Sequence, residues 1–395
     1  MTESLLEFYR RHRISPVRQD IRDLGAHFGR RAALYRHLGI LPAFLRGRTV
    51  VEIGPGSGFN SLYTASLDPA RYVLVEANPR GVDDIGELFS AYPQLAARIE
   101  VVAAAAEDFQ APQPFEFVFC EGMLALAGVP DPARLLRAVA RHTAPGGMLV
   151  ITCIDAVSQL AEVVRRFIAQ CLIDPADDLD RQVQRLLPVF SPHLSTVKGM
   201  TRRHDDWIVD NLLNPASIGP LLSIAGAVAT LDGEFDAFGA SPRFLTDWRW
   251  YKAIAGEDDG FNELALGAYW ANVHALLDYR EVRPARDRAE NQRLYERCLA
   301  VRDAVQEYER SRDRGAQPAV AGRLETVAEA VADFSAPAAA AIAEAAAILR
   351  RPSIDAAAVA ASPRFAPWFG RGQQYLSFSR RSHGKGAETN GRRGG

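Results

Sequence analysis

The fold of this chain is decided by one stretch, Val51-Glu52-Ile53-Gly54-Pro55-Gly56-Ser57-Gly58. A short run rich in β-branched residues leads directly into a turn with a glycine at every second position. β-Branched residues favour strands, and glycine lets the backbone take positive φ angles and approach a ligand closely because it has no Cβ. The stretch therefore predicts the first strand of an α/β sheet, followed by a ligand-binding turn.

The glycine spacing distinguishes between ligands. Dinucleotide-binding turns follow the pattern G-x-G-x-x-G, and here Phe59 stands where the third glycine of that pattern belongs. A phosphate-binding P-loop is also missing, because no Gly-Lys-Ser/Thr follows the turn. Glu52 places a carboxylate beside the turn, which suits a cationic ligand better than a phosphate.

The pattern of strand followed by helix continues after this turn. Short apolar runs alternate with predicted helical segments near residues 58–68, 80–91, 131–142 and 156–172. Five runs are predicted strands: Val50–Ile53, Tyr72–Glu76, Ile99–Ala103, Phe115–Cys120 and Met148–Cys153. Strands that alternate with helices predict a parallel sheet covered on both faces.

The flanking sequence predicts helical additions to this sheet. Expected segments are an N-terminal helical segment (1–48), the sheet domain (49–240), an acceptor-side insertion within it (174–215), a helical region (241–370), a final strand (371–381) and a disordered tail (382–395). Predicted elements after residue 215 are a helix near 216–225, a strand at Ala227–Leu231, and helices at Trp248–Ile254, Leu264–Leu277, Arg288–Tyr308 and Leu324–Leu349. The final strand would complete the sheet as an antiparallel edge.

Five motifs in order carry a resemblance to a known family. They are the acidic-x-Gly-x-Gly-x-Gly turn that begins at Glu52, the acid Glu76 at the end of the second strand, Ala106-Glu107-Asp108-Phe109, Phe115–Gly122 and Thr143–Ile151. Residues 45–155 thereby resemble the class I S-adenosylmethionine-dependent methyltransferases. The resemblance implies a Rossmann-like α/β sheet, here with N-terminal helices and a large C-terminal helical insertion or domain.

The resemblance also implies that S-adenosylmethionine is the cofactor. Residues expected to contact it are Glu52, Gly54, Pro55, Gly56, Gly58, Asn60, Glu76, Ala77 and either Glu107 or Asp108. A carboxylate at the end of the second strand can accept both ribose hydroxyls, which gives Glu76 its expected role. Asp108 is preferred over Glu107 for the adenine amino group. Asn60 either touches the cofactor or only occupies the following helix.

Glu121 directly follows the fourth strand, where methyl donor and acceptor should meet. We expect it to orient the acceptor or remove a proton; the alternative is a charge that favours the start of the next helix. The N-P-P-aromatic sequence of amino-methylating DNA enzymes is missing here, and Glu121 lacks the second glutamate of protein arginine methyltransferases. Both classes are therefore disfavoured.

The segment from Pro192 to Trp207 is the densest in polar groups. His204 is the expected general base, because neighbouring carboxylates raise the basicity of an imidazole. Residues expected on the acceptor side are Arg202, Asp205, Asp206, Trp207 and Asn211. The alternative is a solvated loop in which Asp206 caps a helix at residues 207–213.

Composition and charge limit the kinds of ligand, metal or membrane that we expect the protein to bind. The net charge of −2 gives no support for nucleic-acid binding. Four scattered cysteines, without metal-ligand spacing, indicate reduced thiols and no metal site. The chain shows no secretory signal and no apolar run long enough for a membrane span, so we expect a cytoplasmic protein.

Together these features predict a methyltransferase that acts on an oxygen or nitrogen of a small molecule or glycan. A protein or peptide methyltransferase is the first alternative. A non-catalytic cofactor-binding assembly protein, which forms a homo-oligomer through its helical region, is the second.

Overall fold

The computed structural model describes residues 5–12, 14, 21–124, 129–215, 219–252, 260–313 and 315–382. Its centre is a seven-stranded sheet in the order β3-β2-β1-β4-β5-β7-β6. The strands are β1 (Thr49–Ile53), β2 (Arg71–Glu76), β3 (Ile99–Ala103), β4 (Phe115–Cys120), β5 (Thr143–Cys153), β6 (Phe235–Ser241) and β7 (Gln374–Arg380). All five predicted strands of the N-terminal half are present.

The first five strands are parallel, and β7 pairs antiparallel with both β5 and β6. The chain runs from β1 outward to β3 and then returns to place β4 on the other side of β1. Such a reversal opens a crevice at the carboxyl ends of the strands. The turns after β1 and β4 therefore border the same crevice.

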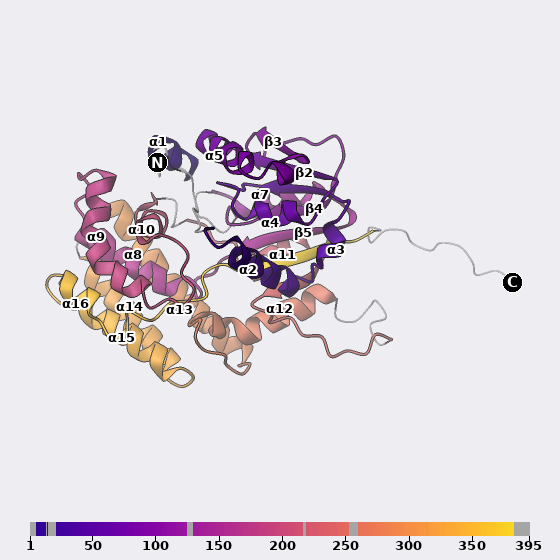
Figure 1. Ribbon diagram of the computed structural model, residues 1–395. Helices are drawn as coiled ribbons and strands as arrows, with labels where there is room; N and C mark the ends of the chain where they lie inside the picture. Colours follow the sequence, from indigo (N-terminus) through magenta and orange to yellow (C-terminus); the bar gives the residue numbers. More distant parts are fainter. Residues whose placement is uncertain are drawn as a thin grey trace.

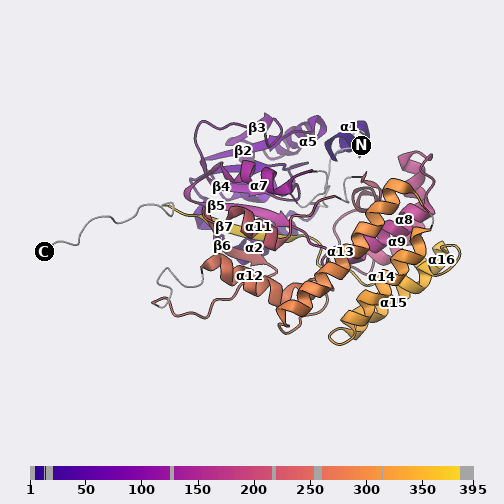
Figure 2. The same cartoon turned by 180° about the vertical axis from the view of Figure 1, so that it is seen from behind.

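Helices cover both faces of the sheet (Figures 1 and 2). The first half contains α1 (Leu5–His12), α2 (Leu24–His37), α3 (Pro42–Leu45), α4 (Ser61–Ser66), α5 (Pro79–Ser90), α6 (Pro93–Ala96), α7 (Pro132–Ala140) and α8 (Leu160–Leu172). Alternation along β1 explains the two faces, because Val50 packs into the cluster with Tyr35 of α2 and Leu62 of α4, whereas Val51 packs into the cluster with Leu136 of α7.

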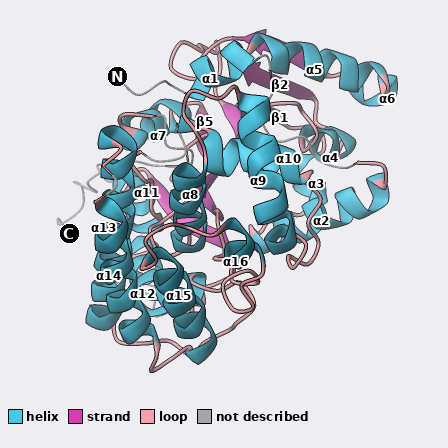
Figure 3. Cartoon of the chain, turned by 90° about the vertical axis from the view of Figure 1, so that its left-hand side faces the viewer, coloured by secondary structure: helices cyan, strands magenta, loops and turns pink. Residues whose placement is uncertain are grey.

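The second half contains a helical lobe beside the carboxyl edge of the sheet (Figure 3). The elements of this half are α9 (Leu179–Leu194), α10 (His204–Ile208), the π-helical turn η1 (Val209–Leu213), α11 (Ile224–Leu231), α12 (Phe261–Asn272), the 3-10 turn η3 (Val273–Leu276), α13 (Arg288–Ser311), α14 (Ala316–Val331), α15 (Ala336–Leu349) and α16 (Ala356–Ala360). Of these, α11 and α12 pack against each other and against β6, so they belong to the sheet rather than to the lobe. Helix α8 packs on α13, and α9 packs on α16. The lobe is thus built from two stretches far apart in sequence.

Several predicted elements after residue 173 were wrong. Residues 227–231 lie in helix α11, because Ser223 accepts a hydrogen bond from the Gly226 amide and caps an alanine-rich segment that favours helix. The strand comes later, as β6. The polar stretch 174–215 is largely helical, since Asp178 caps α9 despite two prolines inside that helix.

Two further helices differ from the prediction. Residues 248–252 are not helical, because the Asp247 carboxylate accepts from the Arg249 amide and forms a turn; residues 253–254 lie outside the described part. The segment 324–349 is two helices rather than one, because Ser335 caps α15 just before Pro337. The predicted final strand (371–381) is β7, which lies between two strands rather than at the edge. Beyond Ser382, the predicted tail is outside the described residues.

Candidate active site

The turn after β1 has the conformation that its glycines predict. Gly54, Gly56 and Gly58 have φ angles of 71°, 60° and 77°, in the region that side chains with a Cβ rarely adopt. The Gly54 amide donates to the Val75 carbonyl at 2.8 Å, which ties the turn to β2. A Cβ added at Gly54 would lie 3.3 Å from the Met123 sulfur, so the turns after β1 and β4 touch.

Glu76 ends β2 and holds the turn in place. Its Oε2 accepts from the Gly56 amide at 2.9 Å, and its Oε1 accepts from the Asn78 amide at 2.8 Å. Burial raises the pKa of Glu76, while these backbone donors favour the charged form. Both oxygens of the carboxylate are therefore oriented by the backbone, and the next residue, Ala77, lines the adjoining cavity.

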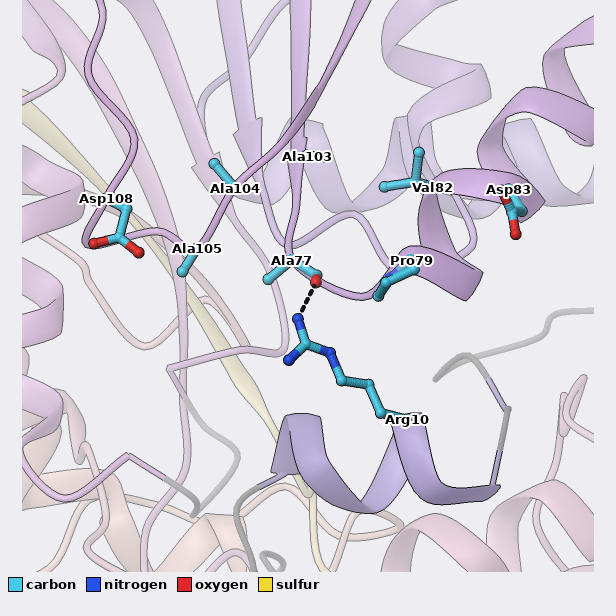
Figure 4. Close-up of a pocket in the computed structure, with 9 residues that line it drawn as sticks. All are labelled: Arg10, Ala77, Pro79, Val82, Asp83, Ala103, Ala104, Ala105 and Asp108. Atoms are coloured by element: carbon cyan, nitrogen blue, oxygen red, sulfur yellow. Dashed lines mark hydrogen bonds between the residues drawn. The ribbon is translucent and has the colours of Figure 1, made fainter.

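A cavity of about 570 Å³ opens beside Glu76, at the ends of β2 and β3 (Figure 4). It is lined by Arg10, Ala77, Pro79, Val82, Asp83, Ala103, Ala104, Ala105 and Asp108. Ala77 and Asp108 were predicted cofactor residues, whereas Glu107 does not line the cavity and lies 3.6 Å from Arg134 at the surface. The small side chains leave a slot lined by two carboxylates, those of Asp83 and Asp108.

Asn60 and Glu52 occupy different surroundings near the turn. The Asn60 Oδ1 is buried and has no hydrogen-bond partner among the described residues, so it can accept from a ligand amine. Glu52 instead accepts from the Ser61 hydroxyl at 2.7 Å and from the Tyr72 hydroxyl. Its carboxylate is engaged inside the protein, and its predicted contact with the cofactor stays a prediction.

Glu52 predicts a pH dependence of stability. Burial, and next the nearby Glu121 charge, raise its pKa from 4.5 to about 7. A folded-state pKa above the unfolded value means that the folded protein holds a proton that the unfolded chain releases, so this contribution falls as pH rises through about 4.5 to 7. Each pKa unit is equal to about 1.4 kcal/mol.

Glu52→Gln should therefore lose less unfolding free energy between pH 5 and pH 8 than the wild type. Urea denaturation at both pH values measures this, with the exposed Glu87→Gln as control. An identical loss in Glu52→Gln and the wild type would contradict the assignment.

Gly81 provides a test of how the cofactor site is positioned. A Cβ at this position of α5 would lie 2.9 Å from the Glu76 Cγ and 3.1 Å from the Gly56 carbonyl oxygen. Gly81→Ala should displace both groups and weaken binding of S-adenosylhomocysteine, the demethylated cofactor, by about tenfold or more, which is about 1.4 kcal/mol.

Gly86 is the matched control on the same helix, because a Cβ there meets nothing within 4 Å. Gly86→Ala should leave binding unchanged and stabilise α5 by about 0.5–1 kcal/mol. Calorimetric titration of both variants checks this pair; equal affinities would show that the Gly81 contact does not position the site.

Glu121 lies directly after β4 and is paired with an arginine. Arg31 of α2 donates to both of its carboxylate oxygens, at 2.8 and 2.5 Å, and both side chains are 7% exposed. A bidentate, buried pair fixes the geometry of the carboxylate. Its catalytic role stays a prediction.

The predicted acceptor residues lie together around α10, but they serve different contacts. Arg202 pairs with Asp210, Asp205 pairs with Arg203, and Trp207 packs edge-on against Phe369. Asn211 donates to the Trp207 carbonyl at 2.9 Å. Asp206 does not cap α10, whose N-cap is Arg203; its buried Oδ2 has no partner among the described residues.

His204 begins α10 and is half-buried. Among the described residues, no hydrogen bond joins it to Glu121. Its role as a general base is not tested by this geometry.

Sequence reasoning missed Arg10 and Arg31, which come from the N-terminal helices α1 and α2. Arg10 lines the cavity, and Arg31 holds Glu121. Each contact joins residues far apart in sequence, and neither helix carries a recognisable motif, so no local signal identifies them.

Within the residues that the structure describes, no group of three or more histidine, cysteine, aspartate or glutamate side chains is arranged to hold a metal ion. None of the helices in that part of the chain is both long and apolar enough to cross a membrane.

Residues 50–147 match the family model described as a methyltransferase domain. This segment is a class I methyltransferase domain, and its cofactor is S-adenosylmethionine. The methyltransferase domain includes the glycine turn, Glu76, Asp108 and Glu121, and it leaves the N-terminal helices and the helical lobe outside the matched region.

Known methyltransferases resemble parts of the chain. Ubiquinone biosynthesis O-methyltransferase of Cupriavidus pinatubonensis is 33% identical over 119 residues, or 29% of this chain and 44% of that protein. The CcbJ methyltransferase of Streptomyces caelestis is 26% identical over 33% of this chain and 51% of its own, with a TM-score of 0.28. PKMT2 of Rickettsia typhi is 12% identical over 61% of this chain and 49% of its own, with a TM-score of 0.42. The chain thus spans less than half of the length of the curated relative.

Proposed function

We propose that this protein transfers the methyl group of S-adenosylmethionine to an oxygen or nitrogen of a small molecule or glycan. The observation that carries the proposal is the juxtaposition at the sheet crevice. A glycine turn, an oriented Glu76 carboxylate and the cavity of about 570 Å³ lie on one side, and Glu121 lies at the end of the neighbouring strand β4.

The residues of the cavity fit the cofactor. The three turn glycines hold positive φ angles that leave the backbone free of side chains, and the unpartnered Asn60 Oδ1 can accept from the ammonium group. Glu76 would accept from the ribose hydroxyls, and Asp108 from the adenine amino group. When bound, the cofactor supplies an electrophilic methyl group on a positively charged sulfur.

The acceptor would approach on the α2 side of Glu121. A hollow of about 500 Å³ borders α2, lined by Arg22, Asp23, Ala26, Arg30, Met200 and Thr201. Arg30 belongs to the same helix as Arg31, which holds Glu121. Arginine in an open hollow favours an acceptor that carries a carboxylate or phosphate group.

Glu121 would orient the acceptor hydroxyl or amine, because Arg31 fixes its two oxygens. His204 is the proposed proton acceptor. Fixed geometry at the reacting centre contributes more to such a displacement than acid–base strength alone.

A peptide acceptor is the second candidate. Trp248, Trp250 and Tyr251 are 93%, 63% and 71% exposed, and such exposed aromatic groups are typical of surfaces that contact macromolecules. This loop extends away from the sheet, past the start of α12 (Figure 1).

The deciding test is tritiated-methyl transfer to host extract separated by size and then by anion exchange. We expect label in small, anionic products, and at least tenfold slower labelling by Arg30→Gln than by its control Arg36→Gln on the same helix. Label in polypeptide would favour the second candidate. Cofactor binding without any labelled product would reject catalysis.

A further inference from the structure

We propose that α1 is a latch on the cofactor site, in which Arg10 contacts the bound cofactor and Tyr9 holds the helix closed against the acceptor-side segment. This inference rests on the proposed function. It assigns cofactor contact to a helix that lies outside the matched methyltransferase domain.

Arg10 reaches from α1 into the cavity. Its Nη2 donates to the Ala77 carbonyl at 3.0 Å, and Figure 4 shows the guanidinium across the slot from Asp108. A guanidinium is planar, stacks on aromatic rings and donates several hydrogen bonds. These properties suit an adenine ring or a ribose oxygen at this position. The cavity thus combines the Arg10 guanidinium with the Asp83 and Asp108 carboxylates.

A second contact ties the chain after α1 to the same turn. The Asn78 side chain donates to the Ile14 carbonyl at 3.1 Å, while the Asn78 amide donates to Glu76. The Ile14 amide in turn donates to the Tyr9 carbonyl at 3.1 Å. The position of α1 is therefore linked to the residues that carry the expected ribose carboxylate.

Tyr9, next to Arg10 in sequence, lies outside the cavity and contacts the acceptor-side segment. It is 3% exposed, its hydroxyl donates to Asp210 Oδ1 at 3.0 Å, and it accepts from the Asn214 amide group at 3.4 Å. Burial, and next the Asp210 carboxylate, raise the pKa of Tyr9 well above its usual value. The hydroxyl therefore stays a neutral donor.

The surface that receives Tyr9 is itself anchored. Arg166 of α8 donates to the Asn214 carbonyl at 2.7 Å and forms a bidentate pair with Glu309, and Gln170 donates to the Leu212 carbonyl at 2.7 Å. Tyr9 of α1 thus contacts a segment, residues 210–214, that buried hydrogen bonds hold to α8.

If the closed position binds cofactor better, the measured dissociation constant rises in inverse proportion to the closed fraction. Loosening Tyr9 should therefore weaken cofactor binding although its hydroxyl lies outside the cavity. Reciprocally, cofactor binding should protect α1.

The test is calorimetric titration of S-adenosylhomocysteine, combined with amide hydrogen exchange of the full chain. Arg10→Ala should raise the dissociation constant about tenfold, whereas Arg11→Ala on the same helix should change it less than twofold. Arg10→Lys, which keeps the charge but loses the planar group, should fall between them. Tyr9→Phe should raise the constant about threefold to fivefold and speed exchange in α1 but not in β2.

In the wild type, ligand should slow exchange in α1. Affinities of Arg10→Ala and Arg10→Lys within twofold of the wild type, or unchanged exchange in α1 on ligand addition, would overturn the latch while leaving the proposed function intact. Failure of the wild type to bind S-adenosylhomocysteine would overturn both.

Discussion

Glu76→Ala should weaken S-adenosylhomocysteine binding by at least about 100-fold, because each hydrogen bond to a charged group contributes about 1.5–3 kcal/mol and two are expected to the ribose. The variant also loses the acceptor for the Gly56 and Asn78 amides, so the turn should lose its fixed shape. The protein should nevertheless fold, since Glu76 lies at a strand end. Calorimetric titration and thermal unfolding measure the two effects separately.

Glu100→Ala is the matched control, because Glu100 lies on the neighbouring strand β3 and pairs only with exposed Arg71 in the described contacts. Its affinity should equal that of the wild type. Glu76→Gln should be intermediate, since it keeps an acceptor oxygen without the charge. Tight binding by Glu76→Ala would mean that the ribose lies elsewhere.

Arg165→Ala should cause the largest loss of stability, about 3–5 kcal/mol, typical of removing one partner from a buried charged network. Arg165 is fully buried in α8 and donates to the Ala161, Phe365 and Ala366 carbonyls and to His193. Its guanidinium carbon also lies 3.7 Å from the centre of the Phe369 ring. Burial lowers the pKa of Arg165 to about 9, so the charge persists at neutral pH.

His193 completes this network as a neutral ring. Its Nε2 donates to the Val359 carbonyl at 2.8 Å, which leaves Nδ1 to accept from Arg165. Exposed Arg185→Ala, on α9, should cost less than about 1 kcal/mol. Urea unfolding of both variants makes the comparison; a loss of similar size in the two would show that the buried network contributes little.

The half of the fold that could be predicted from sequence is the half with local signals. The local signals lie at strands and at the turns that follow them. They are Val50–Ile53 with its glycine turn, Glu76 at the end of β2, and Asp108 in the turn after β3. Each β-branched run and each glycine turn is specified by fewer than ten consecutive residues. Contacts with distant residues therefore had little influence on whether these segments form strands and turns.

The rest depended on contacts between distant segments. Helix α11 was mistaken for a strand because Ala227–Leu231 is short and apolar, and periodicity does not separate the two states at that length. The Arg31–Glu121 pair and the Tyr9–Asp210 bond join N-terminal helices to segments 90 and 201 residues away. No composition or spacing rule encodes such pairings.

The place of β7 in the sheet has a consequence for biosynthesis. In the part of the chain that the structure describes, strand β6 is joined to the parallel strands only through β7, which comprises residues 374–380. During synthesis on the ribosome, the edge of β5 that pairs with β7 therefore has no partner strand until the helical lobe has been made. Open strand edges pair readily with other chains, so a nascent or truncated chain that ends before residue 374 should be prone to aggregation. Of the strands in the described residues, β7 is synthesised last, and it joins β6 to the parallel strands.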